Sequence, residues 1–116
     1  MLGPYRVLDL TDERGWFAGM MLAQLGADVV LVEPPCGWSR SGRNGYHHRA
    51  YNRGKRSVVL DGMAELADLA AGADIVLDNG GLDRAMAPAG EAAGVDLADL
   101  RRHNPALITV RTTPWG

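Results

Sequence analysis

The residues best placed to do chemistry are Asp12, Glu13, Arg14 and Gly15, which lie between a short apolar run and a longer one. A turn between a strand and a helix lies at the carboxyl end of the strand, where open parallel sheets bind ligands. Gly15 would open the helix, and the unpaired N–H groups of a helix N-terminus attract phosphate. Glu33 ends the next apolar run, where dinucleotide sites carry an acid. The turn has one glycine where that fingerprint needs three, which disfavours nicotinamide binding.

A cluster of basic residues is the second candidate for chemistry. Six of the twelve Lys and Arg residues lie between Glu33 and Asp61, in a stretch without Asp or Glu: Arg40, Arg43, Arg49, Arg53, Lys55 and Arg56. Such a stretch is commonly a solvated loop. Alternatively, its guanidinium groups suit a ligand with several phosphates, and Tyr46 and Tyr51 could stack on a base. The residues alone leave both interpretations open.

Other reactive side chains give weaker signals. His47 and His48 are adjacent and have no Cys or acid at ligand spacing, so no metal site is expected. Cys36 has no neighbouring base, and a single cysteine excludes an internal disulfide framework, which favours the cytoplasm. The formal net charge of −2 argues against a nucleic-acid partner. No signal peptide is recognised, and the longest apolar helix, residues 16–25, is too short to span a bilayer.

The elements that must position these residues follow from the hydrophobic pattern. Residues 5–10 and 29–33 are apolar runs of strand length, and residues 16–25 between them are of helix length, which predicts a βαβ unit and hence a parallel sheet. The later expected elements are a strand at 56–60, a helix at 62–71, a strand at 74–77, a helical turn at 82–86, a helix after Asp96 and a strand at 106–111. We therefore predict one α/β domain, 1–116, with a Rossmann-like parallel sheet and helices on both faces.

Two features of the pattern predict a missing cover. The helix at residues 16–25 is apolar nearly all round, and such a helix is usually buried on more than one side. A parallel strand needs cover on both faces, but no helix follows the last strand at 106–111. We therefore expect a truncated domain that packs against a partner.

Five motifs, in order and spacing, resemble the opening of the family III CoA-transferases (the CaiB/BaiF type), which include formyl-CoA transferase, carnitine CoA-transferase and α-methylacyl-CoA racemase. The matching segments are VLDLT at 7–11, LAQLGADVVLVEPP at 22–35, NRGKRSVVLD at 52–61, ADIVLDN at 73–79, and NPALI at 104–108 with PWG at 114–116. The resemblance covers the whole chain but only the first quarter or third of a family member. It implies an incomplete version of a two-domain, dimeric architecture.

The resemblance also implies a set of site residues. By position, the expected CoA contacts are Glu13, Arg14, Pro34, Leu60, Asp61, Gly62, Met63, Asn79, Gly80 and Arg84. The family's catalytic aspartate would lie beyond Gly116, so no catalytic residue is expected in this chain, and the isolated chain is expected to be inactive. Differences from the family pattern occur at Trp16, Pro34 and Gly80.

The leading hypothesis is the CoA-binding amino-terminal part of a CoA-transferase-like enzyme. The family's reaction moves CoA between an acyl-CoA and a carboxylic acid through attack of an enzyme carboxylate on the thioester. The implied partners are an acyl-CoA, an acceptor acid, and a second copy or another chain that completes the fold; no metal, membrane or nucleic acid is implied. The alternatives are a degenerate, non-catalytic module that packs against a partner chain, a racemase-like fragment, and a different Rossmann-like nucleotide binder.

Overall fold

The computed structural model describes residues 2–34, 50–60, 63–86 and 95–113, with the side chains of 63 and 84–86 excepted. Each expected helix and strand is present, with ends shifted by one or two residues. The elements are β1 (Arg6–Asp9), α1 (Trp16–Gln24), β2 (Asp28–Glu33), β3 (Arg56–Val59), α3 (Met63–Ala71), β4 (Ile75–Asp78), α4 (Gly81–Met86), α5 (Leu97–His103) and β5 (Ile108–Arg111).

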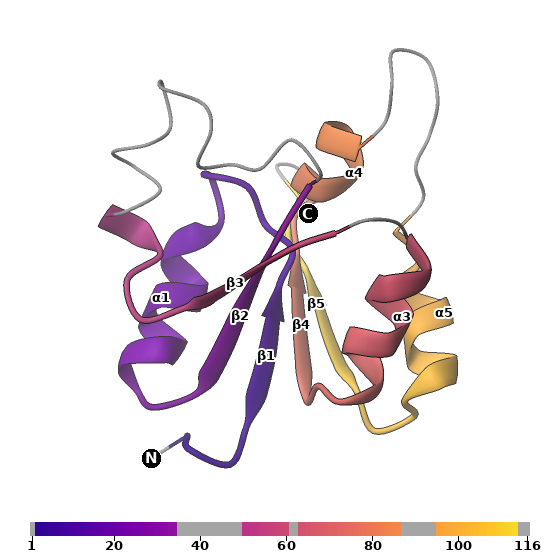
Figure 1. Ribbon diagram of the computed structural model, residues 1–116, viewed down its shortest axis with the longest axis horizontal. Helices are drawn as coiled ribbons and strands as arrows, with labels where there is room; N and C mark the ends of the chain where they lie inside the picture. The colour runs from indigo at the N-terminus through magenta and orange to yellow at the C-terminus, as the bar shows by residue number, and fades with distance from the viewer. Residues whose placement is uncertain (1, 35–49, 61–62, 87–94, 114–116) are drawn as a thin grey trace.

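The strands form one five-stranded sheet in the order β3-β2-β1-β4-β5, and every neighbouring pair is parallel. Helix α1 lies on one face of the sheet, whereas α3 and α5 lie together on the other, and α4 lies beyond the carboxyl ends of the strands (Figure 1). Because all strands point the same way, the turns that follow β1 and β4 meet at one edge. The predicted α/β fold, with a Rossmann-like parallel sheet and helices on both faces, is confirmed.

The two sheet faces bury two separate sets of apolar side chains, because successive strand residues point to opposite faces. Leu8, Val30 and Val76 pack with residues of α3 and α5 in the larger cluster. Val7 and Val29 pack with residues of α1 in a smaller one. The face under α1 therefore has the poorer cover.

Helix α1 is covered on one side only by the described residues. Its buried residues are Trp16 and Gly19, while Phe17 and Met21 are 56% and 45% exposed. On the same sheet face, Ile108 and Val110 of β5 are 59% and 43% exposed; their partners in β4 are Ile75 and Leu77, which belong to the cluster under α1. The expected open apolar surface is therefore present in the part of the chain that the structure describes. No helix in that part is long and apolar enough to cross a membrane.

Side-chain caps join α5 to α3 on the better-covered face. Asp96 caps α5 by accepting hydrogen bonds from the N–H groups of Ala98 and Asp99, as the sequence predicts. At the other end of α5, the Asn104 side chain donates to the carbonyls of Ala70 and Ala73, at 3.1 and 2.7 Å. Ala70 lies in the last turn of α3, and its carbonyl also accepts from the Ala73 N–H at 3.1 Å, whereas Ala73 lies just beyond the helix. The Asn104 side chain therefore bonds the end of α5 to the end of α3 and the residues that follow it.

Candidate functional site

The turn between β1 and α1, residues 11–15, is held by its own polar groups. The Asp12 carboxylate accepts from the Arg14 backbone N–H at 3.1 Å, and from Nε and Nη2 of the Arg14 guanidinium at 3.2 and 2.8 Å. Asp12 is buried, whereas the Arg14 side chain remains 54% exposed. The turn therefore presents a positive group whose orientation is fixed by a bidentate pair.

A second turn, after β4, is bonded directly to the first. The Asn79 side chain accepts from the Asp12 N–H at 3.2 Å and donates to the Asp12 carboxylate at 2.9 Å. The two turns approach so closely that a Cβ on Gly81 would lie 2.5 Å from the Cβ of Asp12. One on Gly15 would lie 3.0 Å from the Asn79 amide nitrogen. Gly80, with a φ of 79°, completes the reversal of the chain.

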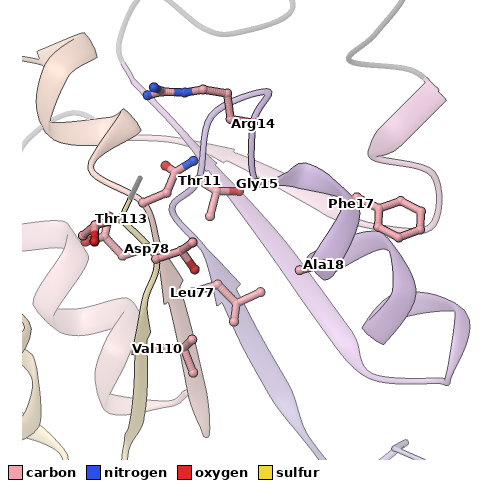
Figure 2. Close-up of a pocket in the computed structure, with 11 residues that line it drawn as sticks. Thr11, Arg14, Gly15, Phe17, Ala18, Leu77, Asp78, Val110 and Thr113 are labelled. Carbon is pink, nitrogen blue, oxygen red and sulfur yellow. The ribbon is translucent and has the colours of Figure 1, made fainter. Parts of the chain in front are cut away.

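A groove of about 520 Å³ opens between α1 and strands β4 and β5, with these two turns at its mouth. Figure 2 shows Leu77 and Val110 on adjacent strands at the sheet face, and Arg14 beyond the strand ends. Thr11 and Thr113 are among the other lining residues. A groove of this volume, apolar along the strands and polar at its mouth, is in the range of ligand sites in α/β proteins.

Below the first turn lies a fully buried ion pair between Lys55 and Asp9. The Lys55 ammonium donates to the Asp9 carboxylate at 2.6 Å, to the Asn52 side chain at 2.6 Å and to the Trp16 carbonyl at 2.9 Å. Neither charged side chain is exposed. Burial lowers the pKa of Lys55, and the neighbouring Asp9 carboxylate opposes this by favouring the charged form. An ammonium group has three N–H donors, so three acceptors satisfy it.

Carboxylates also end β2 and β4, and these too have protein partners. Glu33, at the end of β2, accepts from the Ser57 hydroxyl at 2.5 Å. Asp78, at the end of β4, is fully buried and accepts from Nε and Nη2 of Arg111 at 2.9 and 2.7 Å. The strand-end carboxylates therefore join neighbouring strands. Among the described residues no group of three or more His, Cys, Asp or Glu could hold a metal ion.

The basic cluster does not act as one unit. Lys55 lies in the buried pair, and Arg56 donates to Asp28 at 2.8 and 2.6 Å at the opposite end of the sheet. The hydrogen bonds from Arg56, and then those from Arg6, lower the pKa of Asp28. Lys55 is thus neither a solvated charge nor free to bind phosphate, whereas Arg56 is paired with Asp28 but keeps 62% of its side chain exposed. Arg40, Arg43, Arg49 and Tyr46 lie outside the described residues.

The structure brings part of the predicted CoA-contact set together. Glu13 and Arg14 lie exposed in the first turn, and Asn79 and Gly80 lie in the second turn bonded to it. Leu60, after β3, and Pro34, after β2, are buried at the same edge of the sheet. Met63 begins α3 and Arg84 lies in α4, and nothing is described of their side chains, while Asp61 and Gly62 lie outside the described residues.

Sequence reasoning missed the set formed by Asp9, Asn52, Lys55 and Gly19. A Cβ on Gly19 would be in hard contact with the Asp9 carboxylate and 2.9 Å from the Lys55 nitrogen. The available signal was Gly19 itself, because a glycine inside a helix costs about 1 kcal/mol relative to alanine and usually has a packing reason. The pairing of Asp9 with Lys55, 46 residues later, has no local signal.

The parallel sheet, the two joined turns and the groove beside them define an α/β protein with a groove at the carboxyl edge of its sheet. The sequence profile of CoA-transferase family III matches residues 2–116. The chain belongs to CoA-transferase family III.

Named relatives and solved structures agree with this assignment. The chain is 39% identical to succinate–glutarate CoA-transferase of Agrobacterium fabrum, with 99% of this chain and 32% of the relative covered. It is 31% identical to the succinyl-CoA:(R)-benzylsuccinate CoA-transferase subunit BbsE of Thauera aromatica, with 97% and 30% covered. A hypothetical protein from Mycobacterium tuberculosis superposes with a TM-score of 0.76 at 33% identity, over 99% of this chain and 34% of that one. A CaiB/BaiF family protein from Brucella suis gives a TM-score of 0.74, also at 33% identity, with 95% and 32% covered. The chain thus spans about a third of the length of these proteins.

Proposed function

We propose that residues 1–116 are the CoA-binding amino-terminal domain of a CoA-transferase-like protein, in which CoA passes between an acyl-CoA and a carboxylic acid. The domain supplies contacts to CoA, and the nucleophilic carboxylate of the family reaction comes from outside this span. Membership of family III and the names of the relatives support this proposal.

The observation that carries the proposal is the pair of joined turns at the mouth of the groove. Asp12 and Asn79 bond the turns together, and the Arg14 guanidinium is held at their exposed side. Helix α1 begins here, with no side-chain cap and no acid in its first turn. A fixed guanidinium next to an uncapped helix N-terminus suits the phosphates of CoA.

In this proposal the CoA contacts come from several turns and strand ends of the domain. Glu13 and Arg14 bind from the first turn, and Asn79 and Gly80 from the second. Arg84 follows in α4, and Pro34 and Leu60 with residues 61–63 complete the set from the ends of β2 and β3. The buried members, Pro34 and Leu60, shape the edge rather than donate hydrogen bonds to a ligand.

Calorimetry with CoA, dephospho-CoA and NAD tests the proposal on the purified chain. The parent should bind CoA in preference to NAD, and high salt should weaken binding. Arg14→Ala removes the guanidinium and leaves the Arg14 N–H bond to Asp12 in place. A charged hydrogen bond contributes about 1.5–3 kcal/mol, and less when screened, so the Kd for CoA should rise several-fold to about a hundredfold.

Arg101→Ala is the matched control, because Arg101 is an exposed arginine in the last turn of α5, at the opposite edge of the sheet. It should leave the Kd for CoA unchanged. Binding of NAD with no binding of CoA would refute the proposal and favour a different nucleotide binder. Robust CoA transfer by the isolated chain would refute the proposal that the nucleophilic carboxylate comes from outside residues 1–116.

A second candidate function, a module that packs against a partner polypeptide, is favoured by the open apolar surface. Strands lie about 4.8 Å apart and a helix is about 10 Å wide, so one helix covers about two strands. Helix α1 packs on β1 and β2, and on the same sheet face β5 presents the exposed Ile108 and Val110 next to Ile75 and Leu77 of β4. The surface left open thus fits one more helix with an apolar face, from a second copy or from a partner chain.

Sedimentation of the purified chain tests this second candidate. Exposed apolar patches of this kind mark interfaces, so dimers or larger species are expected. Val110→Lys and Ile108→Lys should shift the distribution toward monomer, while Val59→Lys is the control, because Val59 is a 50% exposed strand residue at the other edge of the sheet. A monomer for the parent at all accessible concentrations would contradict the candidate.

A further inference from the structure

Lys55 and Asp9, an ion pair in which neither side chain is exposed, lie outside the proposed contact set. Lys55 follows a turn closed by a hydrogen bond from its own N–H to the Asn52 carbonyl at 3.2 Å. Its ammonium reaches under the first turn and donates to groups from three parts of the chain: the end of β1 through Asp9, the start of α1 through Trp16, and Asn52. Each N–H donor has an acceptor within 2.9 Å, so no donor is left for a ligand.

The Asp9 carboxylate links this ammonium to the first turn. Its second oxygen accepts from the Thr11 N–H at 3.0 Å and from the Thr11 hydroxyl at 2.5 Å. The Thr11 carbonyl in turn accepts from the Trp16 indole N–H at 3.0 Å, and the Trp16 side chain is fully buried. A continuous set of hydrogen bonds therefore runs from Lys55 to both ends of the 11–15 turn.

The Lys55–Asp9 ion pair also has little free space around it. Helix α1 passes directly over the two charges at Gly19, where an added Cβ would force the Asp9 carboxylate, the Lys55 ammonium or the helix to shift. Moving the ammonium would break its bonds to Asp9 of β1 and to Trp16 of α1, and both elements flank the turn. A side chain held in this way fixes the geometry of its neighbours.

We propose that Lys55 is a positioning residue, which acts through Asp9, Thr11 and Trp16 to hold the 11–15 turn in the conformation that binds CoA. The role in CoA binding rests on the proposed function; the role in ordering the turn does not. Lys55 touches no ligand, and its effect is on where Arg14 and the first N–H groups of α1 lie.

Hydrogen exchange tests the ordering directly. The Trp16 indole N–H resonance, assigned by its loss in Trp16→Phe, reports the turn, and the backbone N–H groups of β4 report global opening. In Lys55→Met the indole exchange rate should rise at least about tenfold more than the β4 rates, since loss of the hydrogen bonds that order the turn lets it open locally without opening the sheet. Leu66→Ala is the control, because Leu66 is a buried residue of α3 on the other sheet face and should raise both rates equally.

A second variant separates positioning from stability. In Asp9→Asn with Lys55→Met neither charge remains, so none is left buried without a partner, while the asparagine oxygen can still accept from Thr11. If Lys55 positions the turn, this stable variant should still show fast indole exchange and bind CoA about ten- to hundredfold more weakly than the parent. Asn52→Ala removes one of the three acceptors of the Lys55 ammonium. It should also speed indole exchange and weaken CoA binding, but by smaller factors than the double variant.

Two results would overturn the inference. One is an equal rise in indole and β4 exchange rates in Lys55→Met and Asn52→Ala, which would mean that the pair only stabilises the fold. The other is slow indole exchange with parental CoA affinity in the double variant. If the parent binds no CoA, the proposed function fails, and the exchange rates still decide whether Lys55 orders the turn.

Discussion

Gly19→Ala gives the sharpest test of the packing over the buried pair, because two effects of opposite sign compete. Alanine in a helix interior is favoured over glycine by about 1 kcal/mol. Position 19 lies in the middle of α1, so propensity alone predicts a more stable protein. The added methyl group would, however, be in hard contact with the Asp9 carboxylate and 2.9 and 3.0 Å from Nζ and Cε of Lys55.

The steric effect should win. Neither charged side chain has exposed surface into which to move, so the methyl group must separate the pair or lift α1. Disrupting a buried ion pair costs about 3–5 kcal/mol. Subtracting the gain in propensity leaves a net loss of about 2–4 kcal/mol. For a chain of this size, about 4 °C per kcal/mol predicts a Tm lower by about 8–16 °C.

Thermal unfolding followed by circular dichroism measures this difference. Ala18→Gly is the matched control, because Ala18 is the exposed neighbour on the same helix, and it should lower stability by about 1 kcal/mol through propensity alone. A Tm for Gly19→Ala equal to or above that of the parent would refute the reasoning, since the methyl group would then have found space beside the charges.

Three further outcomes are expected in urea titrations. Arg56 lowers the pKa of Asp28, so this carboxylate adds stability above about pH 4 that is lost as the pH falls through its lowered pKa. Asp28→Asn should therefore be less stable than the parent at neutral pH, by under about 1 kcal/mol because the pair is exposed, and equally stable in acid. A stability difference between the two proteins that stays the same at neutral and acid pH would contradict this expectation. Asn104→Ala should cost about 1–3 kcal/mol by removing the side-chain donor to the Ala70 and Ala73 carbonyls, and Asn104→Asp, which also lacks the donor, should cost at least as much. Arg111→Met should cost about 3–5 kcal/mol by leaving the buried Asp78 carboxylate unpaired, whereas Arg101→Met, at an exposed site, should be neutral.

The fold was predictable because each element carries its own local signal. Residues 5–10 and 29–33 are strand-length apolar runs, and Gly26, with a φ of 102°, ends α1 where the sequence places its stop. The Asp96 cap is equally local. Hydrophobic periodicity, helix caps and turn residues each depend on a few neighbouring positions, so helices and strands can be predicted from the local sequence.

The site was predictable only in part, because its bonds join distant residues. The turn before α1 was expected at the carboxyl edge, but the bonds that join it to the 79–81 turn, between Asp12 and Asn79, span 67 residues. Lys55 was grouped with the neighbouring arginines by composition, although its partner is Asp9. Which charges pair in the core depends on how the strands are ordered in space, and composition does not encode that order.

The central place of β1 also has a consequence for folding. The first strand of the chain lies in the middle of the sheet and pairs with β2 and with β4, whose residues lie about twenty and about seventy positions later. The second pairing requires closure of a long loop, so the chain has a high contact order and should fold in milliseconds to seconds rather than microseconds. The unit β1–α1–β2 can form first, with one side of β1 unpaired until β4 arrives. During that interval the apolar strand Arg6–Asp9 offers free backbone groups to other chains, so refolding yield should fall as protein concentration rises.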